Sequence, residues 1–302
     1  MEECLLEPVT YYKQLKGKDI RTIISNMLGK LLQIPQQDVN EINEFVNTIH
    51  NASLVIDDIE DNSLLRRNCE CAHIKYGIPL ALNAGYLSIF KKLFEYFTSL
   101  NNSEVTDKTK NTSMLNIIEN MYLGHVGQGM DIYFTANQIV PSLDEYYKMI
   151  DYKTGILFTI ILDLLLVKSK NAVLKKNKDT LHYCLIKLSH FFQIRDDYIN
   201  LTDPEYWKDK GFCQDFDEKK ISFLIAYYCH YKLSGYETII EQLNASAHND
   251  ENKWKLLKLF HDNGLFDMIF DKMTELKCEI LGIMNLQYIF DVLPYKKSQL
   301  FG

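Results

Sequence analysis

Apolar residues recur along much of the chain at the spacing of amphipathic helices. One face of a long predicted helix carries apolar residues at i, i+3, i+4, i+7 and i+14, namely Ile42, Phe45, Val46, Ile49 and Ile56. Asp38 and Glu41 have the spacing of a capping box, which predicts a helix start near Val39. The same apolar spacing predicts a second long helix from Leu181, Cys184, Leu185, Leu188 and Phe192. It should end near Leu201, because the residue before Pro204 avoids the helical region.

Other segments predict further helices and two loops. Ser142 and Glu145 have capping-box spacing and should open a helix. Residues 156–167 are apolar but too few to span a bilayer, so they indicate a buried core helix. Residues 101–111 are polar and predict a loop. Residues 205–220 mix charged and aromatic side chains and predict a long loop, and loops of that length are usually functional or disordered. No segment predicts a strand.

Composition narrows the class of protein. A chain of 302 residues with only 13 Gly and 6 Pro favours long helices, so we expect an all-α, single-domain protein over residues 1–302. A net charge of −7 argues against nucleic acid as a partner. The seven cysteines are scattered and unlike a structural zinc site, which favours reduced thiols and a cytoplasmic location. The acidic N-terminus resembles neither a signal peptide nor a transit peptide.

Two acidic clusters carry the candidate chemistry. Asp57-Asp58-Ile59-Glu60-Asp61 and Asp196-Asp197-Tyr198-Ile199-Asn200 each follow an apolar helical segment. In both, the first residue and the residue four positions later share one helix face. Like charges so placed near a helix C-terminus are unfavourable unless cations bind. Mg²⁺ takes one or two carboxylates plus phosphate oxygens. One such motif is more often a solvated acidic face, but two on apolar helices favour a diphosphate-binding metal site.

Basic and polar residues accompany these clusters. Lysine acts on phosphate as a point charge and arginine grips it with two parallel hydrogen bonds. Each residue alone is more simply a surface charge, and only its relation to the acidic clusters indicates diphosphate binding. The candidates are Lys18, Arg21, Arg66, Arg67, Lys153, Lys210 and Lys220.

These motifs resemble those of the trans-isoprenyl diphosphate synthases, and most closely the eukaryotic geranylgeranyl diphosphate synthases. Residues 50–67 resemble the first aspartate-rich region and residues 191–198 the second. Gly127–Asp131 and Lys153–Gly155 fit the same family in the same order. The resemblance implies an all-α, single-domain helical bundle of the isoprenoid synthase type with a central substrate cavity. It also implies a homodimer or higher homo-oligomer.

The resemblance further implies a reaction and its participants. The reaction is the Mg²⁺-dependent head-to-tail condensation of isopentenyl diphosphate with dimethylallyl, geranyl or farnesyl diphosphate. About three Mg²⁺ ions are expected per active site, held by carboxylate and phosphate oxygens. The product expected is geranylgeranyl diphosphate, with twenty carbons. No nucleic acid and no transmembrane segment is expected.

Residue roles follow from the resemblance where the motifs match. The magnesium set would be Asp57, Asp61 and Asp196, supported by Asp58, Asp197 and Asn200. Isopentenyl diphosphate would be held by Lys18, Arg21, His50 and Arg67. The allylic diphosphate would be held by Arg66, Lys153, Thr154, Gln193, Lys210 and Lys220. Lys153, Thr154 and Gln193 are the expected catalytic dipoles beside the allylic cation. Product length would be set by the small Ala52 and Ser53 and by a floor of Ile89, Phe90 and His125.

The chain departs from the family pattern at a few positions, and other functions stay open. Asn68 replaces a glycine usually found after the two arginines, and Lys219 and Leu224 replace a glycine and a proline around Lys220. A farnesyl diphosphate synthase or a non-catalytic regulatory subunit of a prenyl synthase are the alternatives. A terpene cyclase fits less well, because Asn200 and Pro204 stand where that class has a hydroxyl and a carboxylate.

Overall fold

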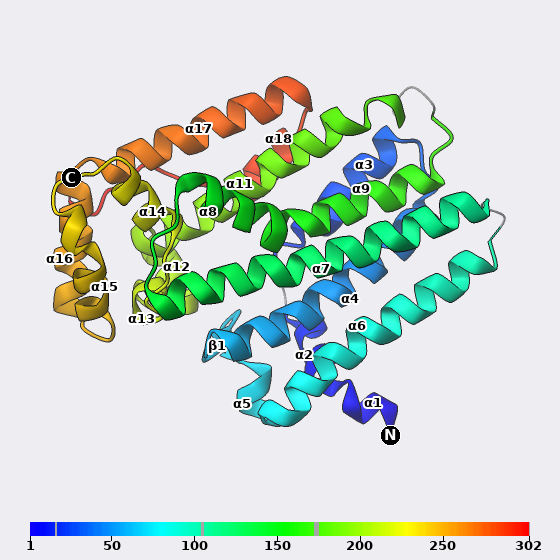
Figure 1. The fold of residues 1–302 in the computed structure, drawn as a ribbon, viewed down its shortest axis with the longest axis horizontal. Coiled ribbons are helices and arrows are strands. Elements are labelled where there is room, and N and C mark those ends of the chain that lie inside the picture. The colour runs from blue at the N-terminus through cyan, green and yellow to red at the C-terminus, as the bar shows by residue number, and fades with distance from the viewer. Residues whose placement is uncertain (16, 104–105, 172–174, 302) are drawn as a thin grey trace. The chain divides into compact units, whose positions relative to one another are not determined.

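Helices make up nearly all of the regular structure (Figure 1), and the residue contacts divide the chain into two units. A computed structural model describes residues 1–15, 17–103, 106–171 and 175–301. One unit comprises Met1–Tyr122 with Ile156–Tyr183, and the other Leu123–Gly155 with Cys184–Gly302. The predicted all-α fold is confirmed. One domain over the whole chain, with a central cavity, stays a prediction.

The first unit holds the N-terminal helices and a short hairpin. Its elements are α1 (Glu2–Leu5), α2 (Glu7–Gln14), α3 (Ile20–Leu31), α4 (Gln36–Glu60), β1 (Leu65–Arg66), β2 (Cys69–Glu70), α5 (Ala72–Tyr76), α6 (Ile78–Asn101), α9 (Ile156–Lys168) and the first parts of α7 (Asp107–Asn137) and α11 (Lys178–Thr202).

The second unit holds the remaining parts of α7 and α11 together with the C-terminal helices. Its other elements are α8 (Leu143–Ile150), the π-helical turn η1 (Asp151–Gly155), α12 (Pro204–Lys210), α13 (Gln214–Asp217), α14 (Phe223–His230), the 3₁₀ turn η2 (Tyr236–Thr238), α15 (Ile239–Ser246), α16 (Asp250–Asp262), α17 (Leu265–Ile283) and α18 (Gln287–Val292).

Helix α4 forms the core of the first unit, where it packs against α3, α6 and α9 (Figure 1). Every apolar residue of its predicted face is buried. Gly85 of α6 permits a close approach, because a Cβ there would lie 2.8 Å from Cγ1 of Ile56 and 3.3 Å from the carbonyl oxygen of Ala52. This packing fixes the end of α4, which carries the first acidic cluster.

The predicted helix starts are partly confirmed. Ser142 and Glu145 form the predicted capping box: the Ser142 hydroxyl accepts from the Glu145 amide at 3.2 Å, and the Glu145 carboxylate accepts from the Ser142 amide at 2.8 Å. The capping box at Asp38 is wrong. Helix α4 begins at Gln36, behind Pro35, and Asp38 instead accepts from Nζ of Lys168 at 2.7 Å.

The apolar segment 156–167 forms the predicted buried helix, α9. Within the part of the chain that the structure describes, no helix combines the length and apolar character needed to cross a membrane.

One predicted loop is shorter than expected, and two other predictions are wrong. The loop expected over residues 101–111 lies between the end of α6 at Asn101 and the start of α7 at Asp107, and residues 104–105 of it lie outside the described residues. Residues 205–220 contain α12 and α13 instead of one long loop, because the Asp203 carboxylate accepts from the Glu205 amide at 3.0 Å and caps α12. Strands β1 and β2 form a small antiparallel hairpin that no sequence pattern indicated.

The segment after α18 packs along α11 in the second unit. Arg195 donates from Nε and Nη2 to the carbonyl oxygen of Pro294 at 3.0 and 2.7 Å. The Tyr198 hydroxyl donates to the carbonyl oxygen of Lys296 at 3.1 Å. Because Arg195 and Tyr198 flank Asp196 and Asp197, these bonds fix the helix that carries the second acidic cluster.

Candidate functional site

The first acidic cluster occupies the last turn of α4. Asp61 caps the helix, with its amide 2.8 Å from the carbonyl oxygen of Asp57. Asn62 follows in the left-handed conformation, and the Ser63 amide donates to the carbonyl oxygen of Asp58 at 3.0 Å. This is a common helix-ending motif. It leaves Asp57 and Asp61 half-buried and one turn apart, while Asp58 is fully buried.

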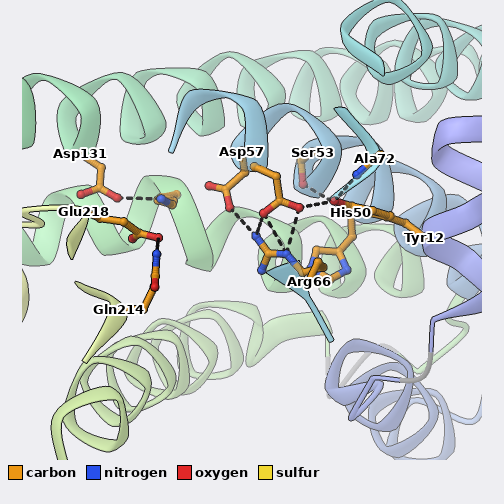
Figure 2. A network of polar contacts seen from close by, with 11 residues as sticks. Tyr12, His50, Ser53, Asp57, Arg66, Ala72, Asp131, Gln214 and Glu218 are labelled. Atoms are coloured by element: carbon orange, nitrogen blue, oxygen red, sulfur yellow. Dashed lines mark hydrogen bonds and ion pairs between the residues drawn. The ribbon is translucent and has the colours of Figure 1, made fainter. Parts of the chain in front are cut away.

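Asp58 binds other side chains of the first unit. Nε of Arg66 donates to its two carboxylate oxygens at 3.0 and 3.1 Å, and the Tyr12 hydroxyl donates to Oδ2. The same hydroxyl accepts from the Ala72 amide at 3.0 Å, and Nη2 of Arg66 donates to Asp57 at 3.2 Å (Figure 2). The geometry therefore favours a supporting role for Asp58 over direct metal ligation.

Arg66 was predicted to hold an allylic diphosphate, and the structure places it on the aspartates. Burial opposes its charge, but Asp58 and then Asp57 more than offset that cost and raise the pKa of Arg66. Its guanidinium thus orients Asp57 and Asp58. A contact with diphosphate stays a prediction.

Arg21, His50 and Arg67 form a cluster of positive charge in the first unit. Burial and then the neighbouring Arg67 lower the pKa of Arg21 to about 10, so Arg21 stays charged at neutral pH. Burial followed by Arg21 and Arg67 lowers the pKa of His50 well below 6.5, so its imidazole is neutral. Nε of Arg21 is buried and has no hydrogen-bond partner among the described residues. A bound anion would offset the repulsion between Arg21 and Arg67 and would accept a hydrogen bond from Nε of Arg21.

Three N-terminal residues, Leu15, Gly17 and Lys18, lie at or beside this cluster. Nη1 of Arg67 donates to the carbonyl oxygen of Leu15 at 2.6 Å. A Cβ on Gly17 would lie 2.7 Å from Cζ of Arg67, so a larger residue at this position would displace the Arg67 guanidinium. Lys18, the fourth predicted isopentenyl diphosphate residue, is exposed at the adjacent position.

The replacement of a glycine by Asn68 fits the hairpin that carries Arg66 and Arg67. Arg67 and Asn68 are the two turn residues between β1 and β2, with φ values of 54° and 62°. A two-residue hairpin turn of type I′ needs positive φ at both positions, and asparagine tolerates it better than most residues. The hairpin therefore forms without the glycine.

The second acidic cluster lies on α11 in the second unit. Asp196 is half-buried, and its Oδ1 accepts from the Tyr206 hydroxyl at 2.8 Å. Asn200 is buried, and its Oδ1 accepts from the Asp215 amide at 3.3 Å. Asp196 is therefore the more accessible carboxylate, while Asn200 links α11 to α13.

Asp197 is a buried acceptor for four donors. Its Oδ2 accepts from the Tyr146 hydroxyl and the Phe223 amide, both at 2.8 Å. Its Oδ1 accepts from Nε2 of Gln193 at 2.9 Å and from Nζ of Lys220 at 3.3 Å. Like Asp58, Asp197 supports its neighbours and is less suited to direct ligation.

Lys220 keeps its charge among several carboxylates. Burial alone would lower its pKa, but Asp215, Asp197 and Asp131 outweigh that effect and raise it well above 10.5. The preceding Lys219 has φ of 54°, and the amides of Lys219 and Lys220 donate to Phe216 and Asp215 at 3.1 and 2.9 Å. This motif ends α13 and favours glycine at the left-handed position. Lysine therefore costs about 1 kcal/mol there but keeps the turn.

The predicted catalytic dipoles come together at η1. The Thr154 hydroxyl donates to Oε1 of Gln193 at 3.2 Å, and Nζ of Lys153 donates to Asp131 at 2.7 Å. Thr154 therefore connects through Gln193 to Asp197. The structure describes only the backbone of Lys210, at the end of α12, so its predicted contact lies outside the described side chains.

The residues predicted to set product length differ in exposure. Ala52 is fully buried against α6, whereas Ser53 is exposed and donates to the carbonyl oxygen of His50 at 2.8 Å. Ile89 is buried, but Phe90 is 67% exposed in the single chain, and His125 is also exposed. The assignment of these three residues to a pocket floor stays a prediction.

Several residues that support the site received no predicted role. They are Tyr12, Asp131, Tyr146, Tyr206 and Asp215. Asp131 lay in the matched segment Gly127–Asp131, which could have indicated it. The three tyrosines contact the aspartates only through the tertiary fold, so no local spacing indicates them.

The donor set fits magnesium better than a metal held by protein alone. Within the described ranges, no three His, Cys, Asp or Glu side chains gather closely enough to form a complete cage. Magnesium needs only one or two carboxylates when substrate phosphates supply the remaining oxygens. Asp57 and Asp61 in the first unit, and Asp196 in the second, are the half-buried carboxylates that could serve in this way.

An all-α fold with two aspartate clusters at helix ends, each beside basic side chains, defines an isoprenoid synthase-type protein. The chain belongs to the polyprenyl synthetase family, whose model matches residues 2–260. That match includes residues from both units.

Curated relatives include synthases of two kinds. A geranylgeranyl pyrophosphate synthase from Clitopilus passeckerianus is 32% identical over 95% of this chain and 80% of its own length. An ophiobolin F synthase from Aspergillus clavatus is 34% identical over 98% of this chain and 38% of its own length. A preasperterpenoid A synthase from Talaromyces verruculosus is 38% identical over 73% of this chain and 27% of its own length. The chain therefore spans well under half of the latter two proteins.

Proposed function

We propose that the chain is a prenyltransferase that condenses isopentenyl diphosphate with allylic diphosphates to make geranylgeranyl diphosphate. The observation that carries this proposal is an arrangement repeated in both units. In each acidic cluster the second aspartate, Asp58 or Asp197, is buried and holds a basic side chain, while the first, Asp57 or Asp196, is half-buried. Family membership supports the same reaction class.

The two clusters would act on the allylic diphosphate. Magnesium held by Asp57, Asp61 and Asp196 would neutralise the diphosphate and make it a leaving group. Lys220, whose charge is maintained by nearby carboxylates, would bind the same group electrostatically. The Thr154 hydroxyl and the Gln193 amide would place their dipoles beside the allylic cation that forms when the carbon–oxygen bond breaks.

The basic cluster would bind isopentenyl diphosphate. Arg21 and Arg67 supply charge, and neutral His50 can donate one hydrogen bond. The isopentenyl double bond then attacks the cation, and the departing diphosphate takes the proton lost in forming the new double bond. This mechanism requires no side chain as a general base.

A turnover assay with isopentenyl and farnesyl diphosphates tests the proposal. We expect a twenty-carbon product in the presence of Mg²⁺, identified by chromatography after dephosphorylation. Elongation that stops at fifteen carbons would indicate a farnesyl diphosphate synthase. No turnover by the purified chain would contradict an independent catalytic role and favour a regulatory subunit.

Ser53→Phe should shorten the product. Ser53 is exposed one helical turn before Asp57 on the same face of α4, so an added ring would lie where a growing chain passes. We expect the main product to change from twenty to fifteen carbons, measured by the same chromatography. Asn40→Phe, at an exposed position near the start of α4, is the control and should keep the twenty-carbon product.

Ala52→Phe is a poorer probe of length. Ala52 is fully buried against α6, so a ring there should overpack the helix contact and destabilise the protein by about 1–3 kcal/mol. An unchanged product from a well-folded Ser53→Phe variant would contradict the assignment of Ser53 to the chain path.

A further inference from the structure

The π-helical turn η1 is shaped by tertiary contacts within the second unit. It joins α8 to α9 and carries Lys153 and Thr154. Gly127 of α7 lets the turn approach closely, because a Cβ there would lie 2.4 Å from the Lys153 amide nitrogen and 2.7 Å from the Tyr152 carbonyl carbon. Isolated π-helical turns are rare and frequently occur at functional sites. Contacts that hold this turn therefore control where Lys153 and Thr154 lie.

One contact of the turn has no place in the reaction described above. Nε2 of His190 lies 2.6 Å from Oδ1 of Asp151, the first residue of η1. Since a carboxylate only accepts, Nε2 carries the proton. His190 is buried, and the Tyr147 ring packs on its imidazole with ring centres 4.6 Å apart. The pair joins α11 to the start of the turn.

The bond from His190 to Asp151 lies beside the bond from Thr154 to Gln193, and both join η1 to α11. Asp151 and Thr154 are three residues apart in η1, and their partners His190 and Gln193 are three apart on α11. Residues so spaced lie on neighbouring parts of one helix face. The two bonds therefore hold both ends of the turn against one face of α11, and Lys153 lies between them.

We propose that His190 and Asp151 are a positioning pair that fixes η1 so that Thr154 and Gln193 face the allylic diphosphate. The inference rests on the proposed function. Neither residue touches substrate in this scheme. Without the pair, the first end of the turn loses its bond to α11, and the Thr154 hydroxyl loses its fixed distance from Gln193. Small errors in the position of catalytic groups are costly in rate.

Substitutions at His190 separate the hydrogen bond from the ring packing. His190→Phe keeps an aromatic ring against Tyr147 but removes the donor to Asp151. His190→Gln restores an N–H donor near the position of Nε2. We expect kcat to fall roughly ten- to a hundredfold in His190→Phe and to recover most of that loss in His190→Gln. The KM for isopentenyl diphosphate should stay unchanged in both.

A second histidine–aspartate pair on the same helix provides the matched control. Nε2 of His182 lies 3.2 Å from Oδ1 of Asp163 in α9, and Nζ of Lys178 also contacts this carboxylate at 2.8 Å. His182→Phe removes an equivalent bond from α11 without touching η1. It should lower the melting temperature and leave kcat at the wild-type value.

Amide hydrogen exchange of residues 151–155 tests whether the His190–Asp151 bond holds η1, and it needs no measurement of turnover. Exchange should quicken in His190→Phe, return toward the wild-type rate in His190→Gln, and stay unchanged in His182→Phe. Wild-type kcat in His190→Phe, or wild-type exchange across η1, would overturn the inference. If the wild-type chain shows no turnover, the proposed function fails, and the exchange rates alone then decide whether the pair holds the turn.

Discussion

Asp57→Ala and Asp196→Ala should each lower kcat by about a thousandfold or more. Each change removes a half-buried carboxylate from a different cluster. If both carboxylates hold magnesium for one diphosphate, losing either removes much of the charge stabilisation of the leaving group, which is worth several kcal/mol. A loss of about 4 kcal/mol corresponds to a thousandfold in rate. Steady-state kinetics with farnesyl and isopentenyl diphosphates measure the effect.

The double variant should be little worse than either single variant, because residues that act as a unit are not additive. A chelator should abolish wild-type turnover, and added Mg²⁺ should restore it. Strictly multiplicative losses, or full activity in chelator, would contradict a shared metal cluster. Asp163→Asn is the matched control, since this half-buried carboxylate binds Lys178 and His182 outside the acidic clusters. It should keep kcat close to the wild-type value.

Local sequence patterns predicted the helices that carry the site. The apolar spacing of α4 and α11 indicates which face of each helix is buried, because an amphipathic helix packs its apolar face against the core. The capping box at Ser142 succeeded because its two partners lie within one turn. The one at Asp38 failed because α4 already begins at Gln36, behind Pro35, so Asp38 lies inside the first turn, where its carboxylate binds Lys168.

Structure that depends on distant contacts could not be predicted. The π-helical turn forms where Gly127 of α7 meets the Lys153 backbone, and no local pattern indicates this contact. The segment 205–220 looked irregular because it mixes charged and aromatic side chains. The aromatic side chains pack on distant ones, as Phe212 does on Trp254 with ring centres 5.0 Å apart. The short helices α12 and α13 were therefore missed.

The sequence also could not separate the roles of adjacent aspartates. Asp57 and Asp58 are chemically identical and adjacent, as are Asp196 and Asp197. Only the fold shows that the second of each pair points into a network of buried donors. The division into ligands, Asp57 and Asp196, and supports, Asp58 and Asp197, rested on the resemblance alone, and the structure adds that the two members of each pair differ in burial and in partners.

Asp197→Ala should differ from Asp196→Ala in what it damages. Asp197 is 1% exposed and accepts from the Tyr146 hydroxyl, the Phe223 amide, Gln193 and Lys220. Removing the carboxylate takes one partner from the buried Lys220. It also leaves the Tyr146 hydroxyl and the Phe223 amide without their acceptor. Breaking a buried charge pair in this way costs about 3–5 kcal/mol.

For a chain of this size the loss should lower the melting temperature of Asp197→Ala by roughly 5–8 °C. Asp196→Ala should change it little, because Asp196 is half-buried. Asp197→Asn keeps an oxygen that can accept from Tyr146 and the Phe223 amide, but its amide group turns a donor toward Gln193 and Lys220. It should therefore lie between wild type and Asp197→Ala in thermal denaturation. An Asp197→Ala protein with the wild-type melting temperature but the kcat loss of Asp196→Ala would show that Asp197 acts as a metal ligand and not as a support.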